Sequence, residues 1–236
     1  MPRARADSAG TFPTPVAAPR FRRALRTWYG KHHRDLPWRR TRDPYRVLVS
    51  ELMLQQTQVS RVLGFYESFL QRFPTLQRLA DARPGRVMEA WAGLGYYARA
   101  RNLHKLARHV TRPGGGGTLP PSVTELRKLP GIGPYTAGAV ASFAYEKRAE
   151  LVDTNVARVL SRAFAPRLNP KRPADLTQIW AIAKSVLPRT GRAAWTHNQA
   201  LMELGALVCT ARVMRCDRCP VRSVCLTGSR NRDRSA

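Results

Sequence analysis

The sequence predicts an all-α protein, and three observations carry this prediction. Apolar side chains recur at helical spacing, most clearly through residues 45–60 and 86–110. Alternating β-branched runs flanked by turn residues, which would indicate strands, are sparse. Proline- and glycine-rich stretches separate the helical segments, notably residues 112–121. With 236 residues, 43% of them hydrophobic, the chain is long enough for one large helical domain or two small ones.

Taken in order, the elements begin with a tail at residues 1–18, which we expect to be disordered. The two helical stretches named above follow. A second helical block has three segments, at residues 153–164, 176–187 and 195–209. Pro188 fits a stop for the middle segment. The polar residues 229–236 are expected to form a second disordered tail.

The charge of the chain indicates a polyanionic partner. Lysine and arginine total 41 against 15 acidic residues, which gives a formal net charge of +26. Residues 20–42 hold nine basic side chains and one acid, and residues 205–236 hold seven arginines and two acids. Nucleic acid is the commonest partner of so basic a protein, so we expect both ends to face phosphates. No apolar stretch approaches the ~18 residues that cross a bilayer. The N-terminus also lacks the apolar run of a secretory signal, so we expect a cytoplasmic protein with no membrane partner.

The four cysteines indicate a metal centre. Cys209, Cys216, Cys219 and Cys225 lie within 17 residues, with the spacing C-x6-C-x2-C-x5-C. Because the cytosol is reducing, thiols so close together argue against disulfides. Four soft ligands in one loop favour an all-thiolate centre, either zinc or iron–sulfur. Four thiolates leave no open position for catalysis, so the expected role is structural or electronic.

Residues 129–137 (LPGIGPYTA) predict a hairpin between two helices. Gly131 and Gly133 permit a tight backbone, and their missing side chains let main-chain N–H groups approach a phosphate. Pro134 suits the first turn of the following helix. Such a helix-hairpin-helix grips the DNA backbone without reading sequence. The alternative is an ordinary interhelical turn.

Two carboxylates stand in contrasting surroundings. Glu51 has apolar neighbours on both sides, which indicates either a buried ion pair or a carboxyl held in its protonated form. Asp153 directly precedes a helical segment, where its simplest role is a helix N-cap. One apolar and one polar carboxylate are also what glycosidic cleavage requires, one to protonate the leaving group and one to stabilise the sugar cation.

Three motifs carry a resemblance to one known family. They are residues 50–59 (SELMLQQTQV), 93–103 (GLGYYARARNL) and 152–156 (VDTNV). Together they closely resemble the adenine DNA glycosylases (MutY family), which belong with endonuclease III to the helix-hairpin-helix glycosylase superfamily. The resemblance covers about residues 36–225, most of the chain.

The resemblance implies a two-lobed helix-hairpin-helix DNA glycosylase fold with a C-terminal [4Fe-4S] cluster loop. A six-helix barrel lobe carrying the hairpin would cover residues 45–150. The other lobe would join residues 19–44 to residues 151–228, with the four cysteines as cluster ligands. The implied partner is double-stranded DNA that contains a mismatched or damaged base pair, bound by a monomer associated with the nucleoid.

The resemblance also implies roles for individual residues. Glu51 would protonate the flipped adenine and activate the water, and Asp153 would stabilise the developing positive charge. Asn155 and Tyr135 would support that pair by hydrogen bonding. Gln56 and Tyr96 match residues that wedge into the duplex. The positions around the base pocket are matched by Arg34, Leu36, Trp38, Val59 and Arg99.

Tyr135 bears on the type of reaction. Lyase-competent relatives such as endonuclease III place a lysine here, and a phenol cannot form the corresponding Schiff base. We therefore expect a monofunctional enzyme that hydrolyses the N-glycosidic bond of adenine mispaired with guanine or 8-oxoguanine.

Two alternatives stay open at this point. The chain ends 11 residues after Cys225, too few for the C-terminal domain with which full-length adenine glycosylases help to recognise 8-oxoguanine. Thymine/uracil glycosylases that act on T:G and U:G mismatches share this short architecture and are the first alternative. A non-catalytic DNA-lesion sensor is the second, and the presence of both carboxylates in motif context argues against it.

Overall fold

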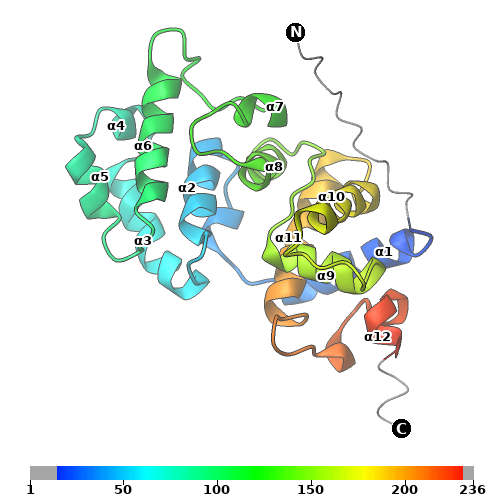
Figure 1. Ribbon diagram of the computed structural model, residues 1–236. Coiled ribbons are helices and arrows are strands. Elements are labelled where there is room, and N and C mark those ends of the chain that lie inside the picture. The colour runs from blue at the N-terminus through cyan, green and yellow to red at the C-terminus, as the bar shows by residue number, and fades with distance from the viewer. Residues whose placement is uncertain (1–14, 231–236) are drawn as a thin grey trace, which may run out of the picture. The chain divides into compact units, whose positions relative to one another are not determined.

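The computed structural model describes residues 15–230, and every regular element in that range is a helix (Figure 1). The predicted all-α class is therefore confirmed. The only strand-like pairing in the described range is a single bridge between Cys209 and Met214. No described helix combines the length and the apolar character needed to cross a membrane.

The chain divides into two compact units. The terminal unit combines the residues up to Arg34 with those from Glu150 onward, and the central unit covers Asp35–Ala149. The resemblance implied that residues 19–44 belong with the terminal lobe; in the structure, residues 35–44 pack within the central unit. One reason is Trp38, which is buried and sets its ring edge-on to Tyr66, 5.4 Å between centroids.

The central unit is built around one buried helix, α2 (Pro44–Leu54). Asp43 caps it, because its carboxylate accepts a hydrogen bond from the Arg46 N–H at 2.9 Å, and Pro44 opens its first turn. Helix α2 packs against α3, α6 and α8. The other helices of the unit are η1 (Pro37–Arg39), α3 (Val59–Arg72), α4 (Leu76–Ala80), α5 (Pro84–Ala90), α6 (Ala98–Thr111), α7 (Val123–Leu126) and α8 (Pro134–Phe143).

Both long helical stretches predicted in the central unit are interrupted. The stretch 45–60 ends as α2 at Leu54 and resumes as α3 at Val59, and the stretch 86–110 breaks between α5 and α6. The interruptions coincide with left-handed backbone at Gln56 (φ 56°) and at Tyr96 (φ 47°). A helix cannot pass through such residues.

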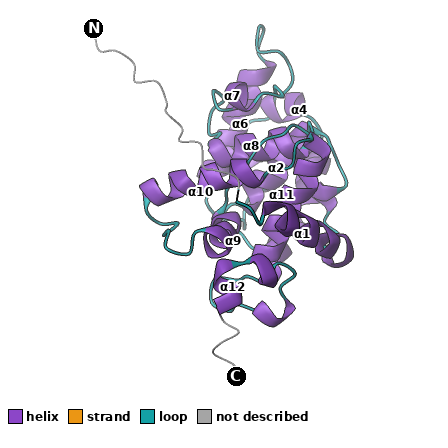
Figure 2. Cartoon of the chain, turned by 90° about the vertical axis from the view of Figure 1, so that its right-hand side faces the viewer, coloured by secondary structure: helices purple, strands orange, loops and turns teal. Residues whose placement is uncertain are grey.

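The terminal unit packs its helices around α9 (Thr154–Phe164) and α11 (Gly191–Leu207). Helix α1 (Ala18–His32) lies against α11, while α10 (Pro173–Val186) and α12 (Leu226–Arg230) lie against α9 (Figure 2). The fully buried Phe21 ring contacts Phe164, 4.9 Å between centroids. Between α11 and α12 run two short 3-10 helices, η2 (Cys216–Arg218) and η3 (Arg222–Val224).

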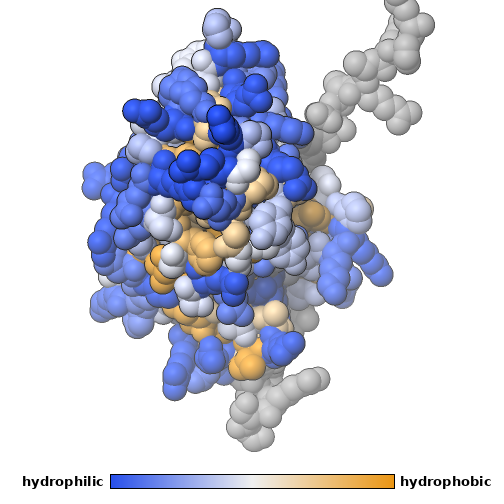
Figure 3. Space-filling model, turned by 90° about the vertical axis from the view of Figure 1, so that its left-hand side faces the viewer, coloured by the Kyte–Doolittle hydropathy of each residue, from blue (hydrophilic) through white to orange (hydrophobic). Residues whose placement is uncertain are grey.

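The predicted tails lie mostly outside the described residues. Of the tail at residues 1–18, residues 15–18 are described, and Ala18 opens α1 fully buried. Of the tail at residues 229–236, residues 229–230 are described, as the end of α12. The surface seen in Figure 3, on the side where Figure 1 draws α4 and α5, is mostly hydrophilic with apolar side chains in scattered patches.

Candidate active site and cysteine-lined cavity

Glu51 and Tyr135 are the first pair of candidate site residues, and they lie in the central unit. Glu51 lies in the third turn of α2 and is only 3% exposed. Tyr135, in the first turn of α8, donates a hydrogen bond from its hydroxyl to Glu51 Oε2 at 2.6 Å. The packing of α2 on α8 brings these residues together although 84 positions separate them. A buried carboxyl with a phenol donor is suited to proton transfer.

The predicted hairpin leads into α8, and its two glycines differ. Gly131 has a φ of 76°, and a Cβ there would lie 2.6 Å from the Cβ of Asn102. Gly133 is the N-cap of α8 with an ordinary φ of −87°, and a Cβ there would meet open space. The tight backbone therefore depends on Gly131. At Gly133, the missing side chain leaves the helix N-terminus open to an anion.

Asp153 and Asn155 are a second pair of candidate site residues, and they lie in the terminal unit. Asp153 is the N-cap of α9: one oxygen accepts from the Val156 N–H at 2.6 Å, and the other from the Asn155 side chain at 2.9 Å. Burial raises the pKa of Asp153 above its ordinary value, and these hydrogen bonds lower it in part. The helix cap and the candidate site residue are thus the same carboxyl group.

Arg158, a residue that sequence reasoning missed, donates a hydrogen bond to the side chain of Asn155. The Arg158 guanidinium donates to the side-chain oxygen of Asn155 at 2.7 Å and to the backbone oxygens of Gly205 and Cys209, both at 2.8 Å. Helix α11 runs so close here that a Cβ on Gly205 would lie 2.6 Å from the Asn155 Cβ. Hydrogen bonds therefore run from Asp153 to the start of the cysteine loop.

Arg34, predicted at the base pocket, is paired with a second residue that sequence reasoning missed. Its guanidinium makes two hydrogen bonds to Glu203, at 2.9 and 2.8 Å, and its backbone N–H makes a third at 2.8 Å. Glu203 lies on α11 and is fully buried. Its apolar neighbours, Leu201 and Leu204, are the same signal that singled out Glu51.

Gln56 and Tyr96, the predicted wedge, lie on two loops of the central unit and line one open groove together with Tyr97 and Arg101. Both side chains are exposed, Tyr96 to 59%. Each has a left-handed backbone, which costs a non-glycine residue about 1–3 kcal/mol and persists only where the surroundings enforce it.

The remaining predicted pocket residues are less accessible. Leu36 and Trp38 are buried, and Val59 is half-buried at the start of α3. Arg99 is also buried, and its guanidinium bonds backbone oxygens of the wedge loops. In this geometry Arg99 supports the two loops, and its predicted place at the base pocket stays a prediction.

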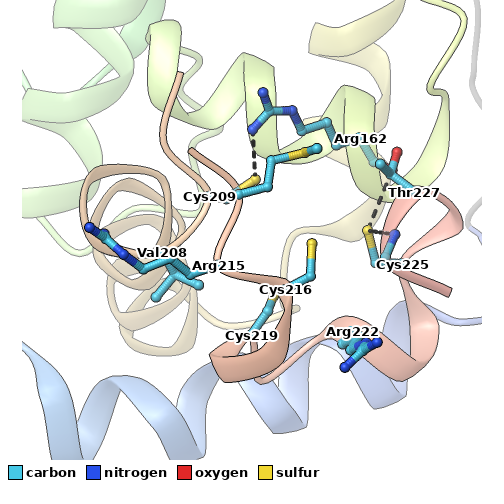
Figure 4. A pocket seen from close by; sticks show the side chains of 11 residues that line it. Arg162, Val208, Cys209, Arg215, Cys216, Cys219, Arg222, Cys225 and Thr227 are labelled. Atoms are coloured by element: carbon cyan, nitrogen blue, oxygen red, sulfur yellow. Dashed lines mark hydrogen bonds between the residues drawn. The ribbon is translucent and has the colours of Figure 1, made fainter. Parts of the chain in front are cut away.

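The four cysteines line one cavity in the terminal unit. All four thiols are free, and Figure 4 shows Cys209, Cys216 and Cys225 directed toward this space. Cys209 Sγ accepts from the Arg162 guanidinium at 3.3 Å, and Cys225 Sγ from the Gly228 N–H at 3.3 Å.

The donor set at this cavity is chemically compatible with a metal centre held by thiolates. In the described range, no group of three or more histidine, cysteine or acidic side chains converges closely enough to hold a single metal ion. The cavity itself is lined by all four soft sulfur ligands, and N–H groups directed at sulfur are a usual support for iron–sulfur centres.

Comparison with known proteins identifies relatives over most of the chain. The human adenine DNA glycosylase is 45% identical over 215 residues, 87% of this chain and 39% of that protein. The Mycobacterium tuberculosis (strain ATCC 25618 / H37Rv) adenine DNA glycosylase is 44% identical over 201 residues, 84% of this chain and 64% of that protein. The chain thus spans about two fifths of the length of the human relative.

Solved structures give the same fold. A thermostable thymine-DNA glycosylase matches 91% of this chain and 99% of its own, with a TM-score of 0.80 and 29% identity. An endonuclease III trapped as a covalent DNA intermediate matches 92% of this chain and all of its own, with a TM-score of 0.73 and 23% identity. The family model of the HhH-GPD superfamily base excision DNA repair proteins matches residues 49–181. The chain, with its hairpin, its buried carboxyl and its capped aspartate, belongs to this superfamily.

Proposed function

We propose that this protein is a DNA glycosylase that removes adenine mispaired with guanine or 8-oxoguanine by hydrolysis of the N-glycosidic bond. The observation that carries the proposal is the buried Glu51 carboxyl with the Tyr135 hydroxyl 2.6 Å from it. The similarity to adenine DNA glycosylases over more than four fifths of the chain supports adenine as the target base.

Glu51 is proposed as the acid. Adenine leaves readily only when a ring nitrogen is protonated, so a carboxyl has to deliver a proton to the base. Burial of Glu51 among apolar residues of α2 favours the protonated form of a carboxyl. The Tyr135 hydroxyl fixes the orientation of that carboxyl. After the base has left, the same carboxylate is suited to accept a proton from the attacking water.

Asp153 is proposed as the anion that stabilises the sugar. The transition state of glycosidic cleavage carries positive charge on the sugar ring, which an adjacent carboxylate stabilises. Two hydrogen-bond donors, the Val156 N–H and the Asn155 amide, favour the ionised form of Asp153 against the effect of burial. The donors thus offset part of the effect of burial on Asp153.

Tyr135 supports hydrolysis without strand incision. A lysine at this position of the hairpin would be able to form a Schiff base with the opened sugar, and a phenol cannot. Borohydride trapping of the wild-type protein on substrate DNA should give no covalent complex, while the free base accumulates. Stoichiometric trapping would contradict the monofunctional proposal.

Double-stranded DNA is the proposed partner. The open N-terminus of α8 after Gly133 is suited to a backbone phosphate, and the exposed side chains of Gln56 and Tyr96 are suited to enter the duplex where the base leaves. The formal net charge of +26 favours binding to the negatively charged DNA backbone. DNA affinity should fall steeply with salt concentration.

A [4Fe-4S] cluster is proposed for the cavity lined by Cys209, Cys216, Cys219 and Cys225. When bound, the cluster cross-links four positions of one loop and offers no open coordination position to a substrate. The loop contains Arg212 and Arg218, both exposed, which the cross-linked loop can hold against DNA phosphates. A brown protein with broad visible absorbance supports this proposal, and a colourless zinc-loaded protein prepared anaerobically contradicts it.

Single-turnover excision on four duplexes tests the proposed activity. They contain A:8-oxoguanine, A:G, T:G and U:G pairs. Release of adenine from the first two supports the proposal, with Glu51→Gln as the inactive control. Release of thymine or uracil alone favours the alternative suggested by the match to a thymine-DNA glycosylase. Tight binding of mismatched DNA with no release of any base favours a non-catalytic sensor.

A further inference from the structure

The guanidinium of Arg99 bonds two loops of the central unit at once. Arg99 lies in the first turn of α6 and is 7% exposed. Its Nη1 donates to Leu52 O and Met53 O, both at 2.8 Å, and also to Gln55 O. Its Nη2 donates to one acceptor in the first loop and two in the second, and its Nε donates to one further acceptor in the second loop. The acceptors are Leu94 O at 3.2 Å, Gly95 O at 3.0 Å, Tyr96 O at 3.4 Å and Thr57 Oγ1 at 3.1 Å.

These acceptors bracket the two strained residues. Gln55 O and Thr57 Oγ1 stand on either side of Gln56, while Gly95 O and Tyr96 O belong to the peptides at Tyr96. Gln56 and Tyr96 are two of the three described non-glycine residues with positive φ. The guanidinium carbon also lies 5.4 Å from the Tyr96 ring centroid and 5.5 Å from that of Trp91. One side chain therefore contacts both left-handed turns.

No donor of Arg99 is left for DNA. A guanidinium has five N–H donors, and seven acceptors from this unit surround it. A lysine could not replace it, because an ammonium has three donors at one point and cannot span two loops.

We infer that Arg99 is a positioning residue that holds the Gln56 and Tyr96 loops as one preformed wedge before DNA binds. This inference rests on the proposed function, since a wedge has use only where a base is extruded. Extrusion of a paired base costs free energy, and the ordering of a loop during binding would add to that cost. A buried guanidinium that orders both loops in advance removes the second contribution. The strain at both residues persists because Arg99 enforces it.

The test is Arg99→Lys, with Arg108→Lys as the matched control. Arg108 is exposed in the last turn of the same helix, so the control makes the same chemical change away from the loops. The target adenine is replaced by 2-aminopurine, an adenine analogue that fluoresces when it leaves the stack. The analogue is placed opposite guanine in one duplex and opposite an abasic site in a second, where it is already weakly held. Stopped-flow fluorescence at saturating protein then reports extrusion independently of excision.

In the duplex with guanine, the fluorescence rise should slow roughly tenfold to a hundredfold in Arg99→Lys and stay unchanged in Arg108→Lys. Opposite the abasic site, the loss should shrink to about twofold or less, because little extrusion is then needed. Equal losses on both duplexes would indicate general damage to the fold and overturn the inference. So would an undiminished rise in Arg99→Lys, or no rise with the wild-type protein.

Two further variants keep the inference open to contradiction if Arg99→Lys does not fold. Thr57→Val removes one acceptor only and should slow extrusion in the same direction by a smaller factor. In a Gln56→Ala, Tyr96→Ala background, Thr57→Val should have no further effect, because the wedge it supports is gone. An undiminished effect in that background would overturn the inference. Failure of the four-duplex excision assay alone would instead contradict the proposed activity.

Discussion

Two carboxyl groups of this protein, Glu51 and Asp153, lie at different helix positions with different hydrogen-bond partners. Glu51 lies in the interior of the largely buried helix α2 and accepts a hydrogen bond from the Tyr135 hydroxyl. Asp153 lies at a helix start, where a backbone N–H and an amide donate to it and an arginine stands behind the amide. Burial favours the neutral form of a carboxyl, and hydrogen-bond donors favour its ionised form. We therefore propose that the local helix position, more than the residue type, distinguishes the acid from the anion in such a pair.

The largest effect should follow a change at Glu51. Glu51→Gln keeps the size of the side chain and an acceptor for Tyr135, but it cannot supply a proton. Single-turnover excision should fall roughly 10²- to 10⁴-fold, while the affinity for mismatched DNA stays within about twofold. Near wild-type excision in a variant that binds normally would refute the assignment of Glu51 as acid.

A smaller loss should follow Asp153→Asn, which separates the cap from the charge. Asparagine caps a helix about as well as aspartate, so the free energy of unfolding should change by no more than about 0.5 kcal/mol. Excision should still fall roughly 10²-fold, because the neutral amide does not stabilise the sugar cation. Asp153→Ala is the matched variant that also loses the cap, at a cost of about 1 kcal/mol. Full activity in Asp153→Asn would leave Asp153 as a cap only.

The features that sequence alone predicts are local ones. The four cysteines lie within 17 residues, so their shared loop needs no tertiary information. The turn at Gly131 and the cap at Asp153 are likewise written in a few adjacent residues. The helical class follows from periodicity summed over long windows, which tolerates errors at single positions.

The features that sequence reasoning missed depend on distance along the chain or on backbone angles. Arg34 and Glu203 pair across 169 positions, and no pattern of spacing predicts that contact. Hydrophobic periodicity also does not reveal the helix breaks at Gln56 and Tyr96. Apolar residues keep helical spacing on both sides of these four- and seven-residue loops. Arg99 matched a base-pocket position by motif, and its burial under two loops appears only in three dimensions.

Tyr135→Phe tests the support of the acid and should have a moderate effect. The change deletes only the hydroxyl that donates to Glu51 Oε2. A hydrogen bond of this kind contributes about 0.5–1.5 kcal/mol net, so excision should fall roughly two- to twelvefold. The pH dependence of single-turnover excision should keep its shape. A loss as large as that of Glu51→Gln would mean that Tyr135 itself transfers a proton.

The smallest effect at neutral pH, and the sharpest test of the anion, should come from Asn155→Ala. The Asn155 amide lowers the pKa of Asp153 against the effect of burial, so its removal should raise that pKa further. Excision near pH 8 should then change by less than about twofold, while the acidic limb of the profile moves to higher pH, because Asp153 is neutralised sooner. Asn169→Ala, in an exposed turn of the same unit, is the control.

The same pKa shift has a consequence for stability with a definite sign. Burial raises the pKa of Asp153 in the folded chain, so the folded state binds this proton more tightly than the unfolded chain does. The contribution of this group to stability is therefore present below its ordinary pKa and is lost as the pH rises through the raised one. Asn155→Ala should extend that loss to higher pH. Denaturant unfolding of both variants between pH 4 and 8 measures it, and identical profiles for Asn155→Ala and Asn169→Ala would show that the amide does not act on Asp153.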